Sequence, residues 1–386
     1  MARRLRFTSQ GGSDDRRVTW LELFFDLVYV AAFGEIALRL EKVDAEHVLS
    51  FSAFFAAAWF SWLANTLFAA RYGNSTRIYA LATLVQMLAL GAVAAAASGA
   101  LQEYAPMLAL AYAVGRGALA VLYFAARGEG APLARRLAGV QALTALLWLA
   151  SAFAADTPRL VLWGLALLAD LMGPLLTLRR QGAALPHEAH LPERLGQLYI
   201  VVLGVVVTEL VKGAAQQPFS WLAQLPPALG LVAVIALWQA YFESTSSTPV
   251  RAAEQQGRPG ALEGWLVLHL PLMGALTALG AGLGHTAAER AENDLVGVTL
   301  GLAFLALAAL RAIAVSYFGR RGDPMTLYLA LAGLLGGALA VWMYPSRLWL
   351  SLLVAALCLG APLVAALSPR AQRVNDQLQE ESAGEE

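Results

Sequence analysis

The sequence predicts an all-α, polytopic membrane protein with about twelve transmembrane helices, arranged in two six-helix halves. Hydrophobic residues make up 59% of the 386-residue chain and charged residues only 14%, with a mean hydropathy of +0.59. An ordinary soluble domain carries about 25% charged residues. Most of this chain must therefore face lipid or other apolar helices, and apolar runs of membrane-spanning length recur from end to end.

The charge balance and the cysteine content exclude several kinds of partner and site. The 27 Lys and Arg residues balance the 27 Asp and Glu residues, whereas a nucleic-acid partner would require a basic excess. Cys358 is the single cysteine, which excludes a disulfide framework and a cysteine-based metal cluster. We therefore expect the lipid bilayer as a partner, with no nucleic acid, no cofactor and no bound metal. The oligomeric state is open.

Twelve runs are long and apolar enough to cross a ~30 Å hydrocarbon core as helix. Their boundaries fall at charged residues or at junctions marked by Pro and Gly. The runs are 18–40, 47–70, 77–99, 103–126, 133–154, 158–178, 194–213, 223–243, 261–284, 294–318, 324–344 and 346–367.

The distribution of Lys and Arg orients these helices. With the N-terminus inside, nineteen of the 27 basic residues fall on the cytoplasmic side and six on the opposite side. The remaining two, Arg116 and Arg311, lie deep inside helices. Cytoplasmic loops of membrane proteins collect Lys and Arg. The bias predicts an even number of spans and places both termini on the cytoplasmic side of the membrane.

The segments outside the spans divide the chain. Residues 1–17 form an Arg-rich cytoplasmic N-terminus that runs into the first span without a small-residue cleavage site, so we expect a retained anchor. Residues 18–180 and 194–367 hold the two membrane halves, joined by a cytoplasmic linker at 181–193. Residues 368–386 form a polar tail for which we expect a solvated or disordered state.

Two similar motifs suggest that the halves are repeats. The pattern Y-F-x-x-R-G-acid begins at Tyr123 and again at Tyr317, after the fourth and tenth spans, and Arg116 or Arg311 precedes each copy by one or two turns. Six spans per half would give both halves the same orientation, as in parallel-repeat transporters. Coincidence within a narrow membrane alphabet is the alternative.

The first span carries the most informative charges. Thr19 and Glu22 fit a capping box, which would make Glu22 a helix cap. Asp26 lies one turn further on the same face, in a stripe with Tyr29 and Phe33, at about 12 Å beyond Val18 by helix rise. At that depth Asp26 needs a partner, and we expect Arg116, with Arg311 next.

A structural ion pair and a residue of a polar pathway are both open for Asp26, because burial alone does not distinguish them. Asp170 lies near mid-depth in the sixth span, where an arginine on a neighbouring helix would pair with it. Glu35, towards the outer end of the first span, either lines a vestibule or reaches water.

Other polar residues have simpler interpretations. His269 is expected as a hydrogen-bonded core histidine rather than a proton relay. Amide side chains within spans can join helices by hydrogen bonds: Asn65, Gln86, Gln141 and Gln239. His187 and His190 flank Glu188 in a Pro-bounded loop, but the spacing is not that of a helical zinc pair, so we expect no metal there.

Residues 18–30 read V-T-W-L-E-L-F-F-D-L-V-Y-V, which resembles the first-helix signature of the bacterial low temperature requirement protein A family, E-L-F-F-D-L-V-[FY]-V. The resemblance continues over the membrane region. It includes Trp59, Trp62, Asn65, Thr66, Arg71, Tyr72, Arg77, Arg116, the stretch 123–127, His190, Glu193, Arg194, Gly196, Leu203 and Gly204.

One position departs from the family. Where the family reads L-G-E in the seventh span, this chain has Val205 after Gly204, and Glu209, one turn on, would have to stand in for the acid. The resemblance implies a bacterial inner-membrane protein but no defined molecular activity. The first-helix motif and the six-plus-six plan are also similar to potassium channels with an F-S-D motif and duplicated halves, which provides a channel alternative.

Three classes of function follow. The leading hypothesis is a secondary transporter or channel-like protein for a small solute or ion. Its polar site would draw on Glu22, Asp26, Glu35, Arg116, Asp170, Glu209 and Arg311. A scaffold or cold-adaptation protein without a substrate is the alternative, in which buried charges neutralise each other. A membrane-embedded enzyme is third, and we expect no enzymatic activity because no nucleophile–base set or ligand cluster is evident.

Overall fold

The structure, a computed structural model, describes residues 18–41, 43–98, 101–128, 130–178, 186–187, 190–244, 248–289, 293–319 and 322–383. All regular secondary structure in these ranges is helical. Contacts divide the chain into two compact units: unit 1 comprises Met1–Arg39 and Leu49–Leu195, and unit 2 comprises Leu40–Val48 and Gly196–Glu386. The predicted fold class, an all-α polytopic protein, is confirmed.

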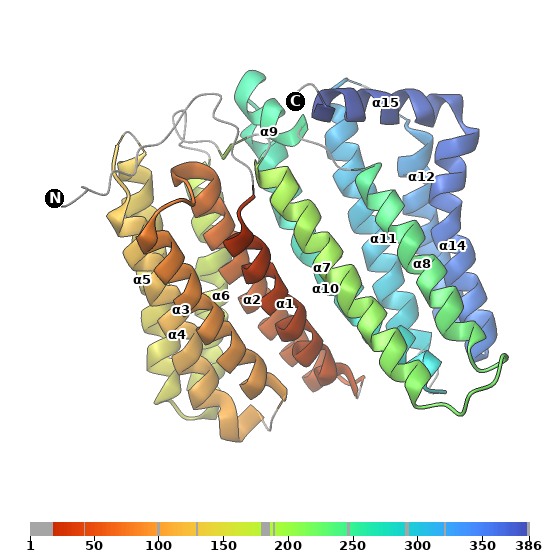
Figure 1. The fold of residues 1–386 in the computed structure, drawn as a ribbon, viewed down its shortest axis with the longest axis horizontal. Coiled ribbons are helices and arrows are strands. Elements are labelled where there is room, and N and C mark those ends of the chain that lie inside the picture. Colours follow the sequence, from red (N-terminus) through yellow and green to blue (C-terminus); the bar gives the residue numbers. More distant parts are fainter. Residues whose placement is uncertain are drawn as a thin grey trace. The chain divides into compact units, whose positions relative to one another are not determined.

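Unit 1 is a bundle of long helices (Figure 1). Its helices are α1 (Trp20–Ala37), α2 (Ala45–Tyr72), α3 (Arg77–Ser98), α4 (Leu101–Ala125), α5 (Ala131–Ala152), α6 (Asp156–Leu178) and the first turn of α7 (His190–Ala215); the short 3-10 helix η1 (Leu38–Glu41) follows α1. Helix α4 packs against α3 and α5, α6 packs against α5, and α1 packs against α3.

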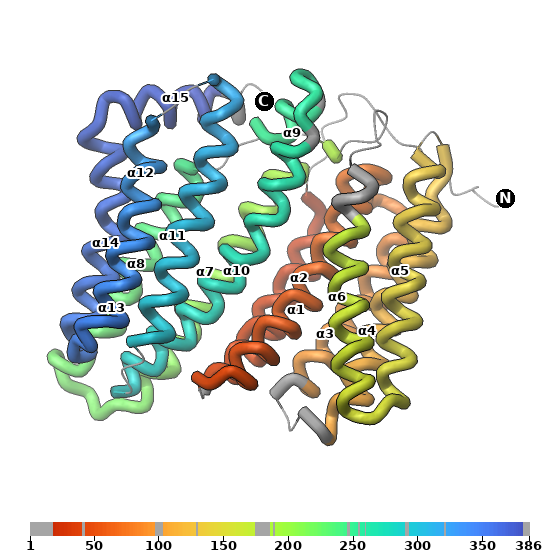
Figure 2. The backbone as a smooth tube through the Cα atoms, turned by 180° about the vertical axis from the view of Figure 1, so that it is seen from behind, coloured from red at the N-terminus to blue at the C-terminus, as the bar shows by residue number. Residues whose placement is uncertain are grey.

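Unit 2 contains the rest of α7 and the helices that follow it. They are α8 (Leu225–Phe242), α9 (Thr248–Gln255), α10 (Pro259–Ala287), α11 (Asn293–Ser316), α12 (Pro324–Leu331), η2 (Ala332–Gly336), α13 (Gly337–Met343), α14 (Arg347–Leu367) and α15 (Pro369–Ala383). Figure 2 shows α12, the π-helical η2 and α13 as one continuous rod. A Cβ on Gly297 of α11 would come within 2.8 Å of the Gly337 carbonyl, so small residues let this rod approach α11 closely.

Helix α15 corrects one prediction. Residues 369–383 are not a disordered tail, because they form a helix that lies across the ends of α11, α12 and α14 (Figure 1). Val374 and Leu378 of α15 are buried against Ala314 and Val315 at the end of α11. The polar composition concealed this short apolar stripe, at i and i+4, which packs on unit 2.

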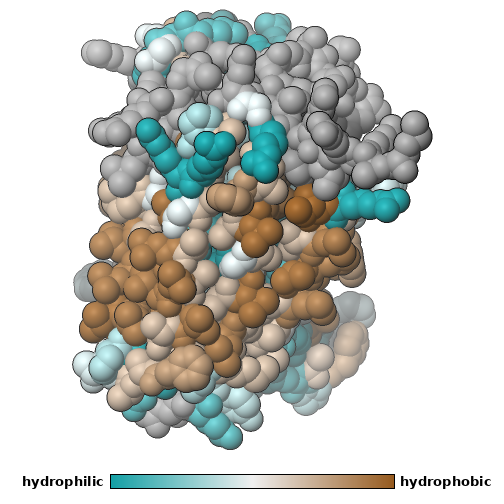
Figure 3. Space-filling model, turned by 90° about the vertical axis from the view of Figure 1, so that its left-hand side faces the viewer, coloured by the Kyte–Doolittle hydropathy of each residue, from teal (hydrophilic) through white to brown (hydrophobic). Residues whose placement is uncertain are grey.

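One side of the molecule carries an apolar band (Figure 3). Figure 3 shows, on one side of the molecule, a band of hydrophobic residues with hydrophilic residues beyond both of its edges. Large apolar side chains that are exposed include Leu88 at 77% and Leu146 at 63%. A soluble protein rarely exposes so large an apolar surface, whereas a bilayer covers such a band.

Nine of the described helices are long and apolar enough to cross a membrane. Three further predicted spans coincide with α1, α5 and α6, which have 18, 22 and 23 residues. Helix α1 carries three acidic residues, so composition alone does not mark it as a span. The predicted N-terminal segment 1–17 and most of the linker 181–193 lie outside the described residues; α7 begins within that predicted linker, at His190.

Candidate functional site

Helix α1 turns one polar stripe toward the interior of unit 1. Glu22, Asp26 and Tyr29 follow each other at helical spacing and are 0%, 2% and 0% exposed. The opposite face exposes Trp20 and Leu27. Burial of two acids on a helix with an apolar outer face requires partners inside the bundle.

Glu22 has a capping role and, in addition, a contact with Asn74 that was not predicted. Thr19 caps α1 and forms the predicted capping box, in which the Glu22 N–H donates to Thr19 Oγ1 at 3.3 Å and the Thr19 N–H donates to Glu22 Oε2 at 2.9 Å. The Thr19 hydroxyl and Asn74 Nδ2 donate to the same oxygen at 3.0 and 2.7 Å. Because Thr19 and Asn74 are half-buried, this end of the site lies next to the surface of unit 1.

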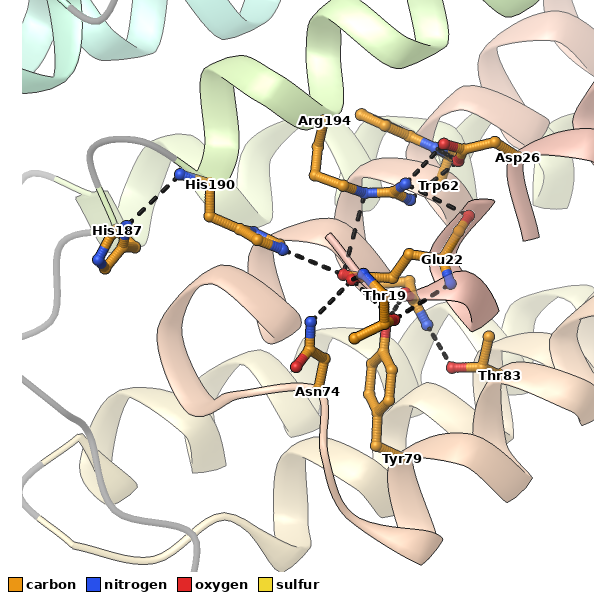
Figure 4. Close-up of polar contacts among 11 residues, drawn as sticks. Thr19, Glu22, Asp26, Trp62, Asn74, Tyr79, Thr83, His187, His190 and Arg194 are labelled. Carbon is orange, nitrogen blue, oxygen red and sulfur yellow. Dashed lines mark hydrogen bonds and ion pairs between the residues drawn. The ribbon is translucent and has the colours of Figure 1, made fainter. Parts of the chain in front are cut away.

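Asp26 forms an ion pair with Arg194, which lies in the second turn of α7. Arg194 donates to both carboxylate oxygens of Asp26, with Nη1–Oδ2 and Nη2–Oδ1 distances of 2.5 and 2.9 Å (Figure 4). Trp62 Nε1 on α2 donates to Oδ1 at 2.8 Å, and the guanidinium carbon lies 5.5 Å from the centre of the Trp62 ring. This bidentate, aromatic-backed geometry suits arginine and not lysine.

The first residue of α7 completes the arrangement. His190 Nε2 lies 3.2 Å from Glu22 Oε1, and the His190 side chain is fully buried. Arg194 also reaches Glu22, with Nη1 donating to its backbone carbonyl at 3.3 Å and Nε 4.0 Å from Oε1. Glu22, Asp26, His190 and Arg194 therefore form one network, which we call the charge cluster.

The charge cluster is not balanced by its fixed charges. Glu22 and Asp26 supply two carboxylates, and Arg194 supplies one guanidinium. With both carboxylates ionised and arginine protonated, the net charge is one negative charge when His190 is neutral and zero when His190 is protonated. A buried site with such an excess attracts a proton or a small cation.

The predicted partner of Asp26 was wrong. Arg116 forms an ion pair with Asp170 on α6, and its Nη1 donates to Gln141 Oε1 at 2.8 Å and to the Phe60 carbonyl at 3.4 Å. The pairing of Asp170 with an arginine of a neighbouring helix is as predicted. The counter-ion of Arg116 is Asp170 on α6, and the counter-ion of Asp26 is Arg194 on α7.

Arg311 has a different role in unit 2. Its Nε and Nη2 donate to the two carboxylate oxygens of Asp323 at 2.6 and 3.2 Å, Nη2 donates to Asn375 Oδ1 at 2.7 Å, and Nη1 donates to the Glu243 carbonyl at 2.6 Å. Asn375 Nδ2 returns a bond of 3.3 Å to the Glu243 carboxylate. These residues join the ends of α8, α11, α12 and α15, and we call them the α15 clasp.

Asp323 lies just before the predicted span at Pro324 and caps α12 through the Thr326 N–H at 2.8 Å. Burial raises the pKa of Asp323, but the hydrogen bonds and charge of Arg311 and the bonds from Thr326 outweigh this effect. The pKa of this carboxyl therefore lies below its usual range.

Several polar residues join helices as predicted. Asn65 donates to Thr83 Oγ1 at 3.2 Å and accepts from the Tyr79 hydroxyl at 3.0 Å, which connects α2 to α3. His269 is a hydrogen-bonded core histidine: its Nδ1 lies 2.7 Å from the Trp265 carbonyl and its Nε2 lies 3.1 Å from the Tyr241 hydroxyl.

The remaining predicted site residues lie elsewhere. Glu35 is half-buried near the end of α1. Glu209 pairs with exposed Lys212 at 2.8 Å on α7, in unit 2, while the charge cluster lies in unit 1. Of the family positions on α7, Glu193 is exposed and Gly204 is half-buried, so only His190 and Arg194 join the cluster.

Sequence reasoning missed two members of the site. Nothing in the sequence distinguishes Trp62 from an ordinary packing or interfacial aromatic, although its indole N–H is the third donor to Asp26. Asn74 follows Gly73, whose φ of +93° marks the turn between α2 and α3, and a polar residue in a turn carries no signal of a long-range contact. Within the described ranges, no three His, Cys, Asp or Glu side chains converge where they could hold a metal ion.

Comparison with known proteins places these residues in a family. Over residues 17–367 the chain matches the family described as bacterial low temperature requirement A protein. It is 26% identical over 295 residues to an uncharacterized protein of Rhizobium meliloti (strain 1021), covering 69% of each chain. No solved structure matched. The charge cluster and α2 to α6 all fall within the matched range, and the chain belongs to the bacterial low temperature requirement A family.

Proposed function

We propose that this protein is a secondary transporter or channel-like protein of the bacterial inner membrane, which moves a small solute or ion and binds an ion at the charge cluster. We propose no catalytic role. The observation that carries this proposal is the charge count of the cluster. Two buried carboxylates, Glu22 and Asp26, face the single guanidinium of Arg194 inside a bundle with an apolar exterior.

An excess charge at this position has no evident structural use. The pair of Asp26 with Arg194 is complete in itself, with two hydrogen bonds and the Trp62 donor. Glu22 adds a second acid that a Gln could replace as a capping-box partner. Ionisable residues in membrane helices are costly, and an uncompensated one marks an ion or proton pathway.

The topology that we propose for this function has twelve spans in two parallel six-helix repeats, with both termini in the cytoplasm. The nineteen-to-six distribution of basic residues supports the orientation. The repeated R-G-acid motif supports the repeat, because Gly128 and Gly322 both have positive φ, of 93° and 72°, in the turn after α4 and α11.

A scaffold without a substrate is the second candidate, and a specific observation favours it. The other deeply buried charges are paired, Arg116 with Asp170 and Arg311 with Asp323, as expected where charges only hold helices together. The two candidates differ in what the excess charge of Glu22 does.

The test is ion flux in proteoliposomes that contain the purified protein. Flux of H⁺, Na⁺ and K⁺ would be measured under imposed gradients for the wild type, Glu22→Gln and Asp26→Asn. Asp156→Asn is the matched control, because this acid is also in unit 1 but is 75% exposed in its pair with Arg159. Size-exclusion profiles and helical content would establish that each variant is folded.

The proposal predicts flux of at least one ion in the wild type and in Asp156→Asn, and its loss in folded Glu22→Gln. Asp26→Asn separates the two candidates: a transporter variant loses flux while it stays folded, whereas a scaffold variant loses only stability. Absence of flux in the wild type under every gradient would contradict the transporter proposal for these ions and favour the scaffold.

A further inference from the structure

The second ring nitrogen of His190 is the one feature of the charge cluster that the pairing of charges leaves unexplained. His190 is fully buried, its Nε2 faces Glu22 Oε1 at 3.2 Å, and its Nδ1 makes no hydrogen bond. Buried polar atoms in proteins are almost always satisfied, so an orphaned imidazole nitrogen calls for a ligand or a water. A ligand of Nδ1 has to be small, because the His190 side chain is fully buried.

From this geometry we infer that His190 Nδ1 is the proton-binding atom of the charge cluster, and that the coupling ion of this protein is H⁺ rather than Na⁺ or K⁺. The inference rests on the proposed transport function and specifies its ion. In the step itself, a hydronium ion transfers a proton to the Nδ1 lone pair. One O–H bond of the hydronium breaks, one N–H bond forms and a water molecule is released, and the net charge of the cluster changes from one negative charge to zero.

The surroundings of His190 fit a proton better than a metal cation. Glu22 Oε2 already accepts three hydrogen bonds, from the Thr19 N–H, the Thr19 hydroxyl and Asn74, and both oxygens of Asp26 are used by Arg194. A metal cation prefers several free oxygen ligands, and of the four carboxylate oxygens of the cluster only Glu22 Oε1, which faces the imidazole, accepts no hydrogen bond. A proton needs only one lone pair.

The charged and titratable groups around His190 act in the same direction. On α1 it faces Glu22, with Asp26 one turn further, and on its own helix it is followed by Arg194; Tyr79 of α3 lies near Glu22. The preceding segment contributes His187, whose Nδ1 accepts from the His190 backbone N–H at 3.4 Å. Two of these groups are acids and one is a fixed cation, so a proton on the imidazole would balance the charges of the cluster.

Arg71, at the end of α2, is another buried cation of unit 1, and it interacts with Tyr72 and Tyr123. Glu193 is exposed.

The first test does not depend on transport. The chain has five histidines, so a sample in lipid nanodiscs labelled with ¹⁵N-histidine gives a simple spectrum, in which His190→Gln identifies the His190 ring signals. We expect His190 to occur in a singly and a doubly protonated form in the folded protein, and the doubly protonated form to be less populated in Glu22→Gln, in which the negative partner is absent. A His190 that stays neutral at every pH at which the protein is folded overturns the inference.

The second test measures H⁺ uptake into liposomes with an internal pH dye, driven by a K⁺ diffusion potential. We expect uptake by the wild type, and its loss to the level of empty liposomes in His190→Gln, in which an amide keeps a donor toward Glu22 but cannot bind a second proton. His47→Gln is the matched control, because His47 is paired with exposed Asp44 at 2.7 Å outside the cluster. Equal uptake by wild type and His190→Gln overturns the inference.

The two tests separate the inference from the function on which it rests. Flux of Na⁺ or K⁺ without H⁺ would leave a transporter but overturn the assignment of the ion. A titrating His190 without flux of any ion would leave a proton-binding cluster and contradict the transport proposal.

Discussion

Removing Arg194 should destabilise the protein more than removing its partner Asp26. Arg194→Gln leaves both Glu22 and Asp26 buried without a guanidinium, and breaking a buried pair in this way costs about 3–5 kcal/mol. Asp26→Asn leaves Arg194 with Glu22 as its counter-ion, with Nε 4.0 Å from Oε1. The loss is then that of a charged hydrogen-bonded contact, about 1.5–3 kcal/mol.

The double variant gives the sharper result. Asp26→Asn with Arg194→Gln removes one charge of each sign, so we expect it to be more stable than Arg194→Gln alone. The coupling free energy should be about 1.5–3 kcal/mol, within the range for residues in contact. Reversible unfolding by SDS in mixed micelles, followed by Trp fluorescence and far-UV circular dichroism, would give the free energies of unfolding.

Arg159→Gln is the control for this cycle, because Arg159 pairs with Asp156 at 3.2 Å at the surface, where a salt bridge is worth about 0–1 kcal/mol. Additive effects of the two cluster variants, or an Asp26→Asn variant that is less stable than Arg194→Gln, would refute the account of the cluster as an excess of acid around one arginine.

Three further outcomes are expected. The pKa of Asp323 is lowered, so its pair with Arg311 contributes stability above the unfolded pKa of about 3.9 and loses it as the pH falls further; acid titration of the unfolding free energy should flatten below pH 4 in Asp323→Asn. Gly322→Ala should cost about 1 kcal/mol in the same unfolding assay, because φ is +72° and no atom lies near the added Cβ; a loss above about 3 kcal/mol would contradict this. Trp62→Phe removes the indole donor to Asp26 and should cost about 1.5–3 kcal/mol, with an unchanged free energy of unfolding as the contrary result.

The helices and the buried acids could be predicted because both follow from local pattern. Apolar runs mark helices, and the capping box at Thr19 and the stripe through Asp26 follow from spacing along a single helix. The pair of Asp170 with a neighbouring arginine could also be expected, since a charge buried that deep has few alternatives.

The partner of Asp26 could not be found from spacing. Arg194 stands at the start of a span, where the positive-inside pattern explains an arginine without any contact. Asp26 and Arg194 lie at similar depths. Asp26 is six residues after the start of α1 and Arg194 four residues after the start of α7, which corresponds to a rise of about 9 and 6 Å along the two helices. Arg116, nine residues before the end of α4, lies deeper, at about 13 Å.

The helix α15 and its clasp were missed for a different reason. Fifteen residues of low hydropathy resemble a disordered tail, and only four apolar or amide positions on one face bury it. Tertiary contacts, above all the bond from Arg311 to Asn375, stabilise a helix that local composition does not favour.

The pair of Asp26 and Arg194 also sets a condition on how the protein is made. The two residues are 168 positions apart, and at about 5–20 residues per second a ribosome needs roughly 10–30 s to synthesise the intervening chain. During that time α1 has left the ribosome with the two acids of the cluster, Glu22 and Asp26, and without the guanidinium of Arg194. A centrally placed acid opposes insertion by about 2.5–3.5 kcal/mol. Helix α1 therefore has to wait at the insertion machinery or in a shallow position until α7 emerges, and a nascent chain that ends before Arg194 should remain an unassembled substrate for membrane proteases.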